Sequence, residues 1–391
     1  MGAIHHFIPT LLPGDGSGNA ARAMQHRLVE LGAESLIFVQ EDKADLGLPT
    51  FDSYPGYANK DDILMYHLAT SSAIPSYLRT LRQDVVVNYQ NLTPPNYFRP
   101  YNAVAAAFQD RGMAELRLLA DQAVMGIAPS MFNLKDMINA GFSVVEQSPI
   151  ILDPSDFMGA GDAQASKMLY DLSDKGFSNW LFVGRLVPNK AQEHLIMALA
   201  AHREIYGDTA VLHLVGRPTY YGYTKALYEL TKSLDLLDRV NFVMGVSPAE
   251  LAAFYTMSDI FISTSEHEGF CMPIVEALFH GLSVIAYDAG AVPETLGIGG
   301  IHLDDRDPIT IASWANRIMN SSELRNNLAE LAAARTNQLS PRSTIARFDE
   351  VVARLLKLTN RDWSLDFDQP SSLVRNYDEF GARFQATGQH S

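Results

Sequence analysis

Two glutamates with seven residues between them, Glu268 and Glu276, flank a glycine turn and are the side chains best suited to chemistry in this chain. The apolar run 259–263 before them predicts a buried parallel strand. Pro273 favours the first position of a following helix, which places Glu276 in the first helical turn. A carboxylate there stays ionised and accepts hydrogen bonds from a vicinal diol, while Gly269 lets backbone approach a ligand closely. The pattern predicts a binding site for a polyol such as a sugar or a ribose.

A second group of polar residues follows an earlier apolar strand, residues 180–184, which ends at Gly184. Arg185 and Lys190 come next, and the helical pattern 193–200 begins directly after them. Two cations beside a helix N-terminus suit a diphosphate. The alternative is a pair of ordinary surface charges.

These residues belong to a repeating order of strand, loop and helix. Glu294 lies in the loop that follows one of the later strands. The order predicts an open, doubly wound α/β sheet, with ligands at the carboxyl ends of the strands. Besides the two runs above, the predicted strands of this half are 209–216, 239–244 and 283–287.

Residues 182–190, followed at the right distance by 265–277, resemble the donor-binding domain of the retaining family 4 glycosyltransferases. The resemblance is close over residues 178–300 and looser in the N-terminal half. It implies the GT-B fold, in which two Rossmann-like domains face each other across a cleft.

The resemblance also implies a reaction. A hexose would move from a nucleotide-diphosphate sugar, GDP-mannose or a UDP-hexose, to a hydroxyl of a glycan, lipid-linked or small acceptor. Retention is described in this family as a front-face process that uses no enzymic nucleophile, so positioning and electrostatics would lower most of the barrier. The implied donor-site residues are Arg185 and Lys190 for the diphosphate, Glu276 for the ribose, Glu268 with Gly269, Phe270 and Cys271 for the sugar, and Gly184 and Glu294 beside them.

The N-terminal half begins with a predicted strand, residues 3–8, and a glycine-rich loop from Gly14 through Gly16 to Gly18. The glycine spacing does not fit a dinucleotide fingerprint, which makes a dehydrogenase the weakest alternative. In the GT-B interpretation this loop faces the donor diphosphate; otherwise it is a flexible surface loop. Further strands are predicted at 35–39, 62–66, 84–88 and 124–130.

One position departs from the family pattern. Many relatives have a Tyr-His-Asn segment after the 84–88 strand, whereas this chain has Gln90 in place of the histidine. An amide cannot titrate, so a protonated imidazole is excluded there. His67, at the end of the preceding strand, is a candidate replacement, although a lone histidine is more often structural. Gln90 also keeps open a non-catalytic nucleotide-sugar-binding subunit; a phosphorylase or an epimerase is a further GT-B alternative.

The chain length of 391 residues predicts two domains. A segment rich in Ser, Asp, Gly and Pro, residues 145–176, marks the linker and the entry to the second domain. We place an acceptor-binding domain at 1–150, a donor-binding domain at 151–360, and a C-terminal segment at 361–391 that returns to the first domain.

Composition and charge disfavour several classes of protein. A net charge of −15 disfavours nucleic-acid binding, and no apolar run is long enough to cross a membrane. The start of the chain lacks the features of a signal peptide, and a single cysteine fits a reducing compartment. We therefore expect a cytoplasmic enzyme, with a peripheral position at the inner membrane face and a homo-oligomer both left open. No metal cofactor is expected, because 304–307 is interpreted as a solvated turn and His5 and His6 lack further ligands.

Overall fold

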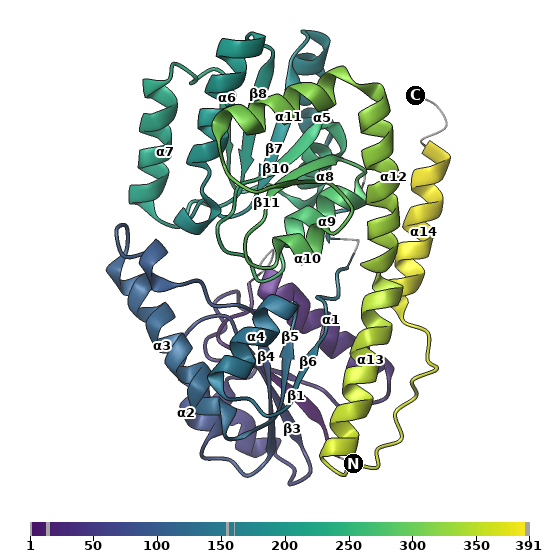
Figure 1. Ribbon diagram of the computed structural model, residues 1–391. Helices are drawn as coiled ribbons and strands as arrows, with labels where there is room; N and C mark the ends of the chain where they lie inside the picture. Colours follow the sequence, from purple (N-terminus) through teal and green to yellow (C-terminus); the bar gives the residue numbers. More distant parts are fainter. Residues whose placement is uncertain (1, 13–15, 154–155, 160, 388–391) are drawn as a thin grey trace. The chain divides into compact units, whose positions relative to one another are not determined.

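The computed structural model describes residues 2–12, 16–153, 156–159 and 161–387 and divides into two compact α/β units (Figure 1). The first unit comprises Met1–Pro95, Val104–Pro154 and Ser340–Ser391, and the second comprises Asn96–Ala103 and Ser155–Leu339. Within the described residues, no helix combines the length and the apolar character that crossing a membrane requires.

The first unit is built on a six-stranded parallel sheet with the order β2-β1-β3-β4-β5-β6. Its strand residues are buried almost without interruption, as expected for a parallel sheet covered on both faces. The order reverses between β1 and β3, which places a topological switch point there. The strands are β1 (Ile4–Ile8), β2 (Ile37–Val39), β3 (Ile63–Leu68), β4 (Asp84–Tyr89), β5 (Ala123–Ala128) and β6 (Val145–Gln147), and the helices are α1 (Gly16–Glu30), α2 (Ile74–Leu78), α3 (Ala103–Ala120), α4 (Met131–Ala140), α13 (Pro341–Leu358) and α14 (Ser372–Thr387).

The second unit contains another six-stranded parallel sheet, with the order β12-β11-β10-β7-β8-β9. Here the switch point falls between β7 and β10, which pair directly. The strands are β7 (Ser178–Val183), β8 (Ala210–Val215), β9 (Val240–Val243), β10 (Ile260–Ser263), β11 (Ser283–Tyr287) and β12 (Ile301–Leu303), and the helices are α5 (Ala163–Asp174), α6 (Glu193–Tyr206), α7 (Tyr221–Ser233), α8 (Pro248–Met257), α9 (Met272–Phe279), α10 (Val292–Leu296), α11 (Pro308–Asn320) and α12 (Ser322–Gln338).

Alternating side chains of this second sheet feed two separate cores. Trp180 and Phe182 of β7 pack on one face, in a core shared with α6 and α11. Leu181 packs on the other face, in a core shared with α5, α8 and α9. Both faces of the sheet are therefore covered by helices (Figure 1). The loops that carry the polar candidate residues follow the carboxyl ends of its strands.

The structure differs from the sequence-based domains and linker in four places. The change of unit lies at residues 154/155 rather than at 150, and the short segment 96–103 belongs to the second unit, where the Phe98 ring lies 5.4 Å from that of Tyr220. Within the expected linker, residues 145–147 form strand β6 at the edge of the first sheet. The return to the first unit begins at Ser340, so α13 belongs there and not to the donor-binding domain.

Helix α13 is bound to the first unit by its apolar face and by ion pairs to α1 and β6, of which the pair with α1 is the most buried. Phe348, Val352 and Leu355 join the core that contains Ile4 of β1. Arg27 of α1 donates two parallel hydrogen bonds to the carboxylate of Asp349, at 2.9 and 2.6 Å. The sequence pattern of residues 342–358 predicts one amphipathic helix but contains no local signal for the partner that its apolar face meets.

We expect Arg27→Ala to lower the free energy of unfolding by about 2 kcal/mol or more, because it leaves the Asp349 carboxylate, 15% exposed, without its cation. The matched control is Arg342→Ala, which removes the 68% exposed partner of Asp378 and is expected to cost less than about 1 kcal/mol. Urea denaturation of both variants measures the difference. Equal losses would contradict the role of this pair in holding α13.

Candidate functional site

The predicted diphosphate-binding and sugar-binding residues of the second unit meet at its switch point. Lys190 lies in the β7–α6 loop (residues 184–192), and Glu268 lies in the β10–α9 loop (residues 264–271). Because β7 and β10 are neighbours, the two loops emerge side by side at the carboxyl edge of the sheet. This is where ligands bind in open α/β sheets.

The ammonium group of Lys190 forms a hydrogen-bonded ion pair with the Glu268 carboxylate. Both side chains are largely buried, at 14% and 8% exposure. The surrounding backbone holds the loops together, since Glu266 N–H donates to Asn189 O at 2.8 Å and the Asn189 amide donates to His267 O at 3.1 Å. The site therefore presents one cation and one carboxylate at fixed positions, as binding of a diphosphate beside a polyol would need.

Arg185 and Gly184 occupy the start of the same β7–α6 loop. The Arg185 side chain is exposed, while its backbone carbonyl accepts a 2.9 Å hydrogen bond from Gln192. The loop after β8 passes close to Gly184. A Cβ atom on Gly216 in that loop would lie only 1.9 Å from the carbonyl oxygen of Gly184. The structure thus brings Gly184, Arg185 and Lys190 into one loop.

The β11–α10 loop approaches Glu268 from the opposite side. Ala291 N–H donates to Glu268 O at 2.9 Å, and a Cβ on Gly290 would lie 2.5 Å from the same oxygen. Gly290 also has φ of +58°, so a side chain there would be excluded on both grounds. Glu294 lies in the first turn of α10, the helix that follows this loop.

The position of Glu276 in its helix differs from the predicted one. Helix α9 begins at Met272, one residue before Pro273, so Glu276 lies in the second helical turn rather than the first. Its carboxylate oxygen Oε2 accepts a 2.6 Å hydrogen bond from the phenol of Tyr255. Burial raises the pKa of Glu276 to about 7, and the Tyr255 hydrogen bond acts in the opposite direction. The group is poised between its neutral and charged forms at neutral pH, rather than held ionised by the helix dipole.

Gly269, Phe270 and Cys271 are buried and complete the β10–α9 loop. Thr295 anchors this part of the loop by donating a hydrogen bond to Phe270 O. Cys271 precedes α9 with φ of 68° and ψ of 66°, a left-handed conformation that favours glycine. Burial raises the pKa of the Cys271 thiol well above its ordinary value, which keeps it protonated and agrees with a structural role.

Replacing Cys271 separates backbone strain from packing. We expect Cys271→Gly to stay within about 1 kcal/mol of the wild-type free energy of unfolding, because relief of a strain of about 1–2 kcal/mol offsets the lost thiol contacts. Cys271→Val is expected to destabilise by more than about 2 kcal/mol, since a β-branched residue is a steric outlier at positive φ. Urea denaturation decides, and a better tolerated valine would contradict the strain.

The candidate residues of the first unit lie near its own switch point, between β1 and β3. Helix α1 begins at Gly16, so Gly16 and Gly18 are helical and not part of a loop, whereas Gly14 lies outside the described residues. The amide of Gln90, after β4, lies 3.4 Å from His67 Nδ1. The structure brings Gln90 and His67 together.

His67 is a fully buried imidazole in this structure. It has no exposed surface, and burial lowers its pKa to about 3. Its other ring nitrogen lies 2.8 Å from Nδ1 of His6, and the two rings stack. His67 therefore lies beneath Gln90 as a neutral supporting residue, because its strand is covered on both faces.

Several contacts of the second unit were missed from the sequence. Residues 304–307 are not simply a solvated turn, because Arg306 pairs with Glu266 and lies 4.9 Å from the centre of the Tyr287 ring. Asp307 caps α11. Tyr255, the partner of Glu276, also carried no local signal.

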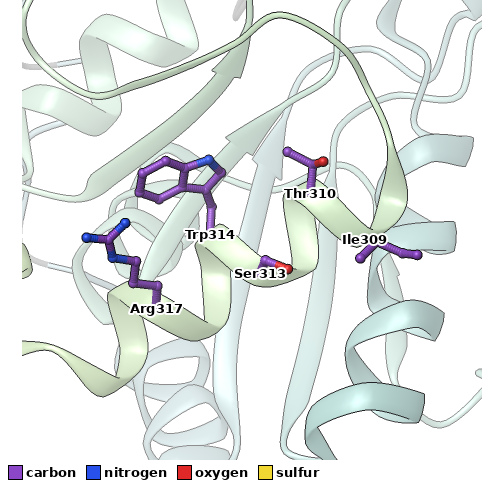
Figure 2. A pocket seen from close by; sticks show the side chains of 5 residues that line it. All are labelled: Ile309, Thr310, Ser313, Trp314 and Arg317. Carbon is purple, nitrogen blue, oxygen red and sulfur yellow. The ribbon is translucent and has the colours of Figure 1, made fainter.

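A surface pocket of about 260 Å³ lies on helix α11, with Trp314 and Arg317 projecting from it (Figure 2). Its remaining lining residues are Ile309, Thr310 and Ser313, so one helix supplies the whole lining. It contains none of the predicted site residues, and the strand ends remain the candidate site.

Comparison with known proteins agrees with this geometry. The structure superposes on Anabaena Alr3699/HepE, solved in complex with UDP-glucose, with a TM-score of 0.70 and 19% identity, covering 90% of this chain and 99% of that one. Sucrose-phosphate synthase from Thermosynechococcus elongatus gives a TM-score of 0.70 at 18% identity, with 91% and 99% covered. The fold is therefore the GT-B fold, with two Rossmann-like α/β units.

A narrower match comes from sequence. Residues 172–335, less than half of the chain, match the family described as Glycosyl transferases group 1. A D-inositol 3-phosphate glycosyltransferase of Salinispora tropica is 28% identical over 56% of this chain and 48% of its own length. A GDP-mannose-dependent alpha-(1-6)-phosphatidylinositol monomannoside mannosyltransferase of Mycolicibacterium smegmatis is 31% identical over 44% and 46%. The chain thus spans about half the length of these relatives, and the matched family segment contains Lys190, Glu268 and Glu276.

Proposed function

We propose that this protein is a glycosyltransferase that transfers a hexose from a nucleotide-diphosphate sugar to a hydroxyl group, with retention of the anomeric configuration. The observation that carries the proposal is the Lys190–Glu268 pair at the β7/β10 switch point, within the segment that matches the glycosyltransferase family. The assignment to family 4 belongs to the same proposal.

In this proposal Lys190 and the exposed Arg185 bind the donor diphosphate. Glu268, with the backbone of Gly269, Phe270 and Cys271, binds the hydroxyls of the donor sugar, and Glu276 accepts hydrogen bonds from the ribose. Gly184 and Glu294 border this donor site from the β7–α6 loop and from α10. Gly16 and Gln90 are proposed to serve the reaction from the first unit, with His67 supporting Gln90.

The proposed reaction forms no covalent bond between the sugar and the enzyme. The bond from the anomeric carbon to the phosphate oxygen breaks, and the acceptor oxygen bonds to that carbon on the same face. The acceptor proton passes to an oxygen of the departing diphosphate. Lys190, Arg185 and backbone amides meet the charge on that diphosphate, so we propose a reaction without a metal cofactor.

The donor is proposed to be GDP-mannose or a UDP-hexose. One relative is named as GDP-mannose-dependent, and one structural neighbour was solved with UDP-glucose. A glycan, a lipid-linked sugar or a small polyol is proposed as acceptor, as in the synthesis of a polysaccharide or a glycolipid. A cytoplasmic location, at the inner membrane face if the acceptor is lipid-linked, belongs to the same proposal.

Release of nucleoside diphosphate from a panel of nucleotide sugars tests the proposal, with product formation followed by mass spectrometry in the presence of mono- and disaccharide, inositol and lipid-linked acceptors. Transfer from one donor with release of its diphosphate is the expected result. A requirement for free phosphate would identify a phosphorylase instead, and interconversion of the sugar without an acceptor would identify an epimerase.

Gln90 supports one alternative, a nucleotide-sugar-binding subunit without transferase activity. Its amide lies 3.4 Å from Nδ1 of the buried His67 and cannot supply a proton as an imidazolium would. Tight binding of a nucleotide sugar together with no turnover on any acceptor would favour this alternative.

A further inference from the structure

Tyr255 is a buried side chain of α8 that no part of the proposed reaction has used. Its phenol donates a 2.6 Å hydrogen bond to Oε2 of Glu276, 21 residues further along the chain. The tyrosine has no exposed surface, so this hydroxyl cannot exchange its partner for bulk water without a rearrangement of the core.

The ring of Tyr255 is fixed on both sides. It stacks on His280 with ring centroids 5.2 Å apart and planes inclined by 12°, and it lies 6.3 Å from Phe261 of β10. His280 is itself anchored, because its Nε2 lies 3.0 Å from the carbonyl oxygen of Phe157 and therefore donates to it. The phenol oxygen is held at one position, which fixes the direction of the hydrogen bond that Tyr255 donates to Glu276.

We propose that Tyr255 is a positioning residue for Glu276, which fixes one carboxylate oxygen so that the remaining acceptor positions face a ligand diol. A carboxylate offers about four lone-pair positions, and the tyrosine occupies one of those on Oε2. The inference rests on the proposed function, in which that diol is the ribose of the donor nucleotide.

The charges around Glu276 make this contact important for its ionisation. Burial and the nearby Asp156 both raise the pKa of Glu276, whereas the Tyr255 hydrogen bond lowers it. Two further titratable groups lie beside Tyr255: the thiol of Cys271, whose pKa burial raises, and His280, whose pKa burial lowers, so both are neutral near pH 7. Tyr255 therefore favours the charged form that a diol would bind.

The first arm of the test needs no ligand. Tyr255→Phe removes one oxygen and keeps the stacked ring, and Tyr228→Phe on α7 makes the same change at a side chain that is 49% exposed. Thermal unfolding is measured from pH 5.5 to 8.5. The melting temperature of Tyr255→Phe should fall increasingly below that of the wild type as the pH rises through 7, because the charged form of Glu276 loses its donor. Tyr228→Phe should show no such trend.

The same measurement in a Glu276→Gln background isolates the pair. There the pH-dependent part of the Tyr255→Phe effect should disappear, since no ionisable partner remains. A loss that is equal at every pH, or a trend that persists without Glu276, would show a purely structural tyrosine and overturn the inference.

The second arm measures binding of UDP and GDP by calorimetry from pH 6 to 9. For the diphosphate that binds, Tyr255→Phe should move the pH profile of affinity upward by about one unit, which is close to tenfold weaker binding below pH 7 and little change at pH 9. If the wild type binds a diphosphate and the pH profile of affinity is the same for Tyr255→Phe, the positioning role of Tyr255 is overturned, and the proposed ribose site is not. A wild type that binds neither diphosphate, despite the expected stability trend, overturns the ribose-site assignment and leaves the Tyr255–Glu276 contact as a structural pair.

Discussion

Lys190→Ala is expected to lower the turnover number by about 10²–10³-fold, the loss typical of removing one preorganised group that stabilises developing charge. The loss in donor affinity should be smaller, because the lysine charge matters most as the diphosphate departs. Steady-state kinetics with the best donor of the panel gives both quantities.

The variant should also be less stable, since Glu268 is only 8% exposed and loses its cation. Lys190→Ala combined with Glu268→Gln should recover part of the melting temperature and none of the turnover. Lys167→Ala, which breaks an exposed ion pair on α5, serves as the control and should stay within about twofold of the wild type. Small and equal effects of Lys190→Ala on turnover and donor affinity would remove this residue from the site.

Glu276→Gln is expected to weaken nucleoside diphosphate binding by about 10–100-fold at pH 8, because two hydrogen bonds to a charged acceptor become bonds to a neutral amide. The wild-type affinity should increase as the pH rises from 6 to 8, through the Glu276 pKa of about 7. The affinity of the variant should be independent of pH over this range. Calorimetric titration at several pH values measures both.

The stability of the ligand-free protein should respond in the opposite sense. The folded Glu276 pKa of about 7 lies above the ordinary glutamate value of 4.5, so the folded state binds more protons between these values and stability falls as pH rises through that interval. Glu276→Gln should therefore be more stable than the wild type at pH 8 while binding less ligand. Glu229→Gln, an exposed substitution on α7, is the control and should change neither property. A variant that binds as tightly as the wild type at pH 8 would contradict the assigned role.

The sequence predicts most strands of the second unit because its four inner strands, β7, β8, β10 and β11, are almost wholly buried and are bounded by turn residues. The run 283–287 matches β11 residue for residue, and the runs before Arg185 and Glu268 end where the site begins. Parallel topology then predicts which loops meet, since the carboxyl ends of neighbouring strands share one edge.

The remaining features depended on tertiary contacts. Strand β6 has three residues and lies at a sheet edge, so its polar composition resembled a linker. Helix α13 follows the second unit in the chain, yet its partner Arg27 lies 322 residues earlier. The position of His67 at the end of a strand places it near Gln90, but the sequence does not show that residues packed over both faces of the sheet bury its side chain. The Tyr255–Glu276 hydrogen bond joins two different helices, and the periodic pattern of apolar residues within each helix does not indicate which side chains of the two helices meet.

The most direct test of the account is a thermal-shift panel with UDP, GDP, ADP and dTDP at millimolar concentration and pH 8, applied to the wild type and to Glu276→Ala. A diphosphate present at about 100 times its dissociation constant adds roughly 2.7 kcal/mol to the stability of the folded state. The account predicts that one of the ribonucleoside diphosphates UDP, GDP and ADP, whose ribose carries the vicinal diol, stabilises the wild type and that the shift is lost in Glu276→Ala. No shift with any diphosphate, or the same shift in both proteins, would contradict it.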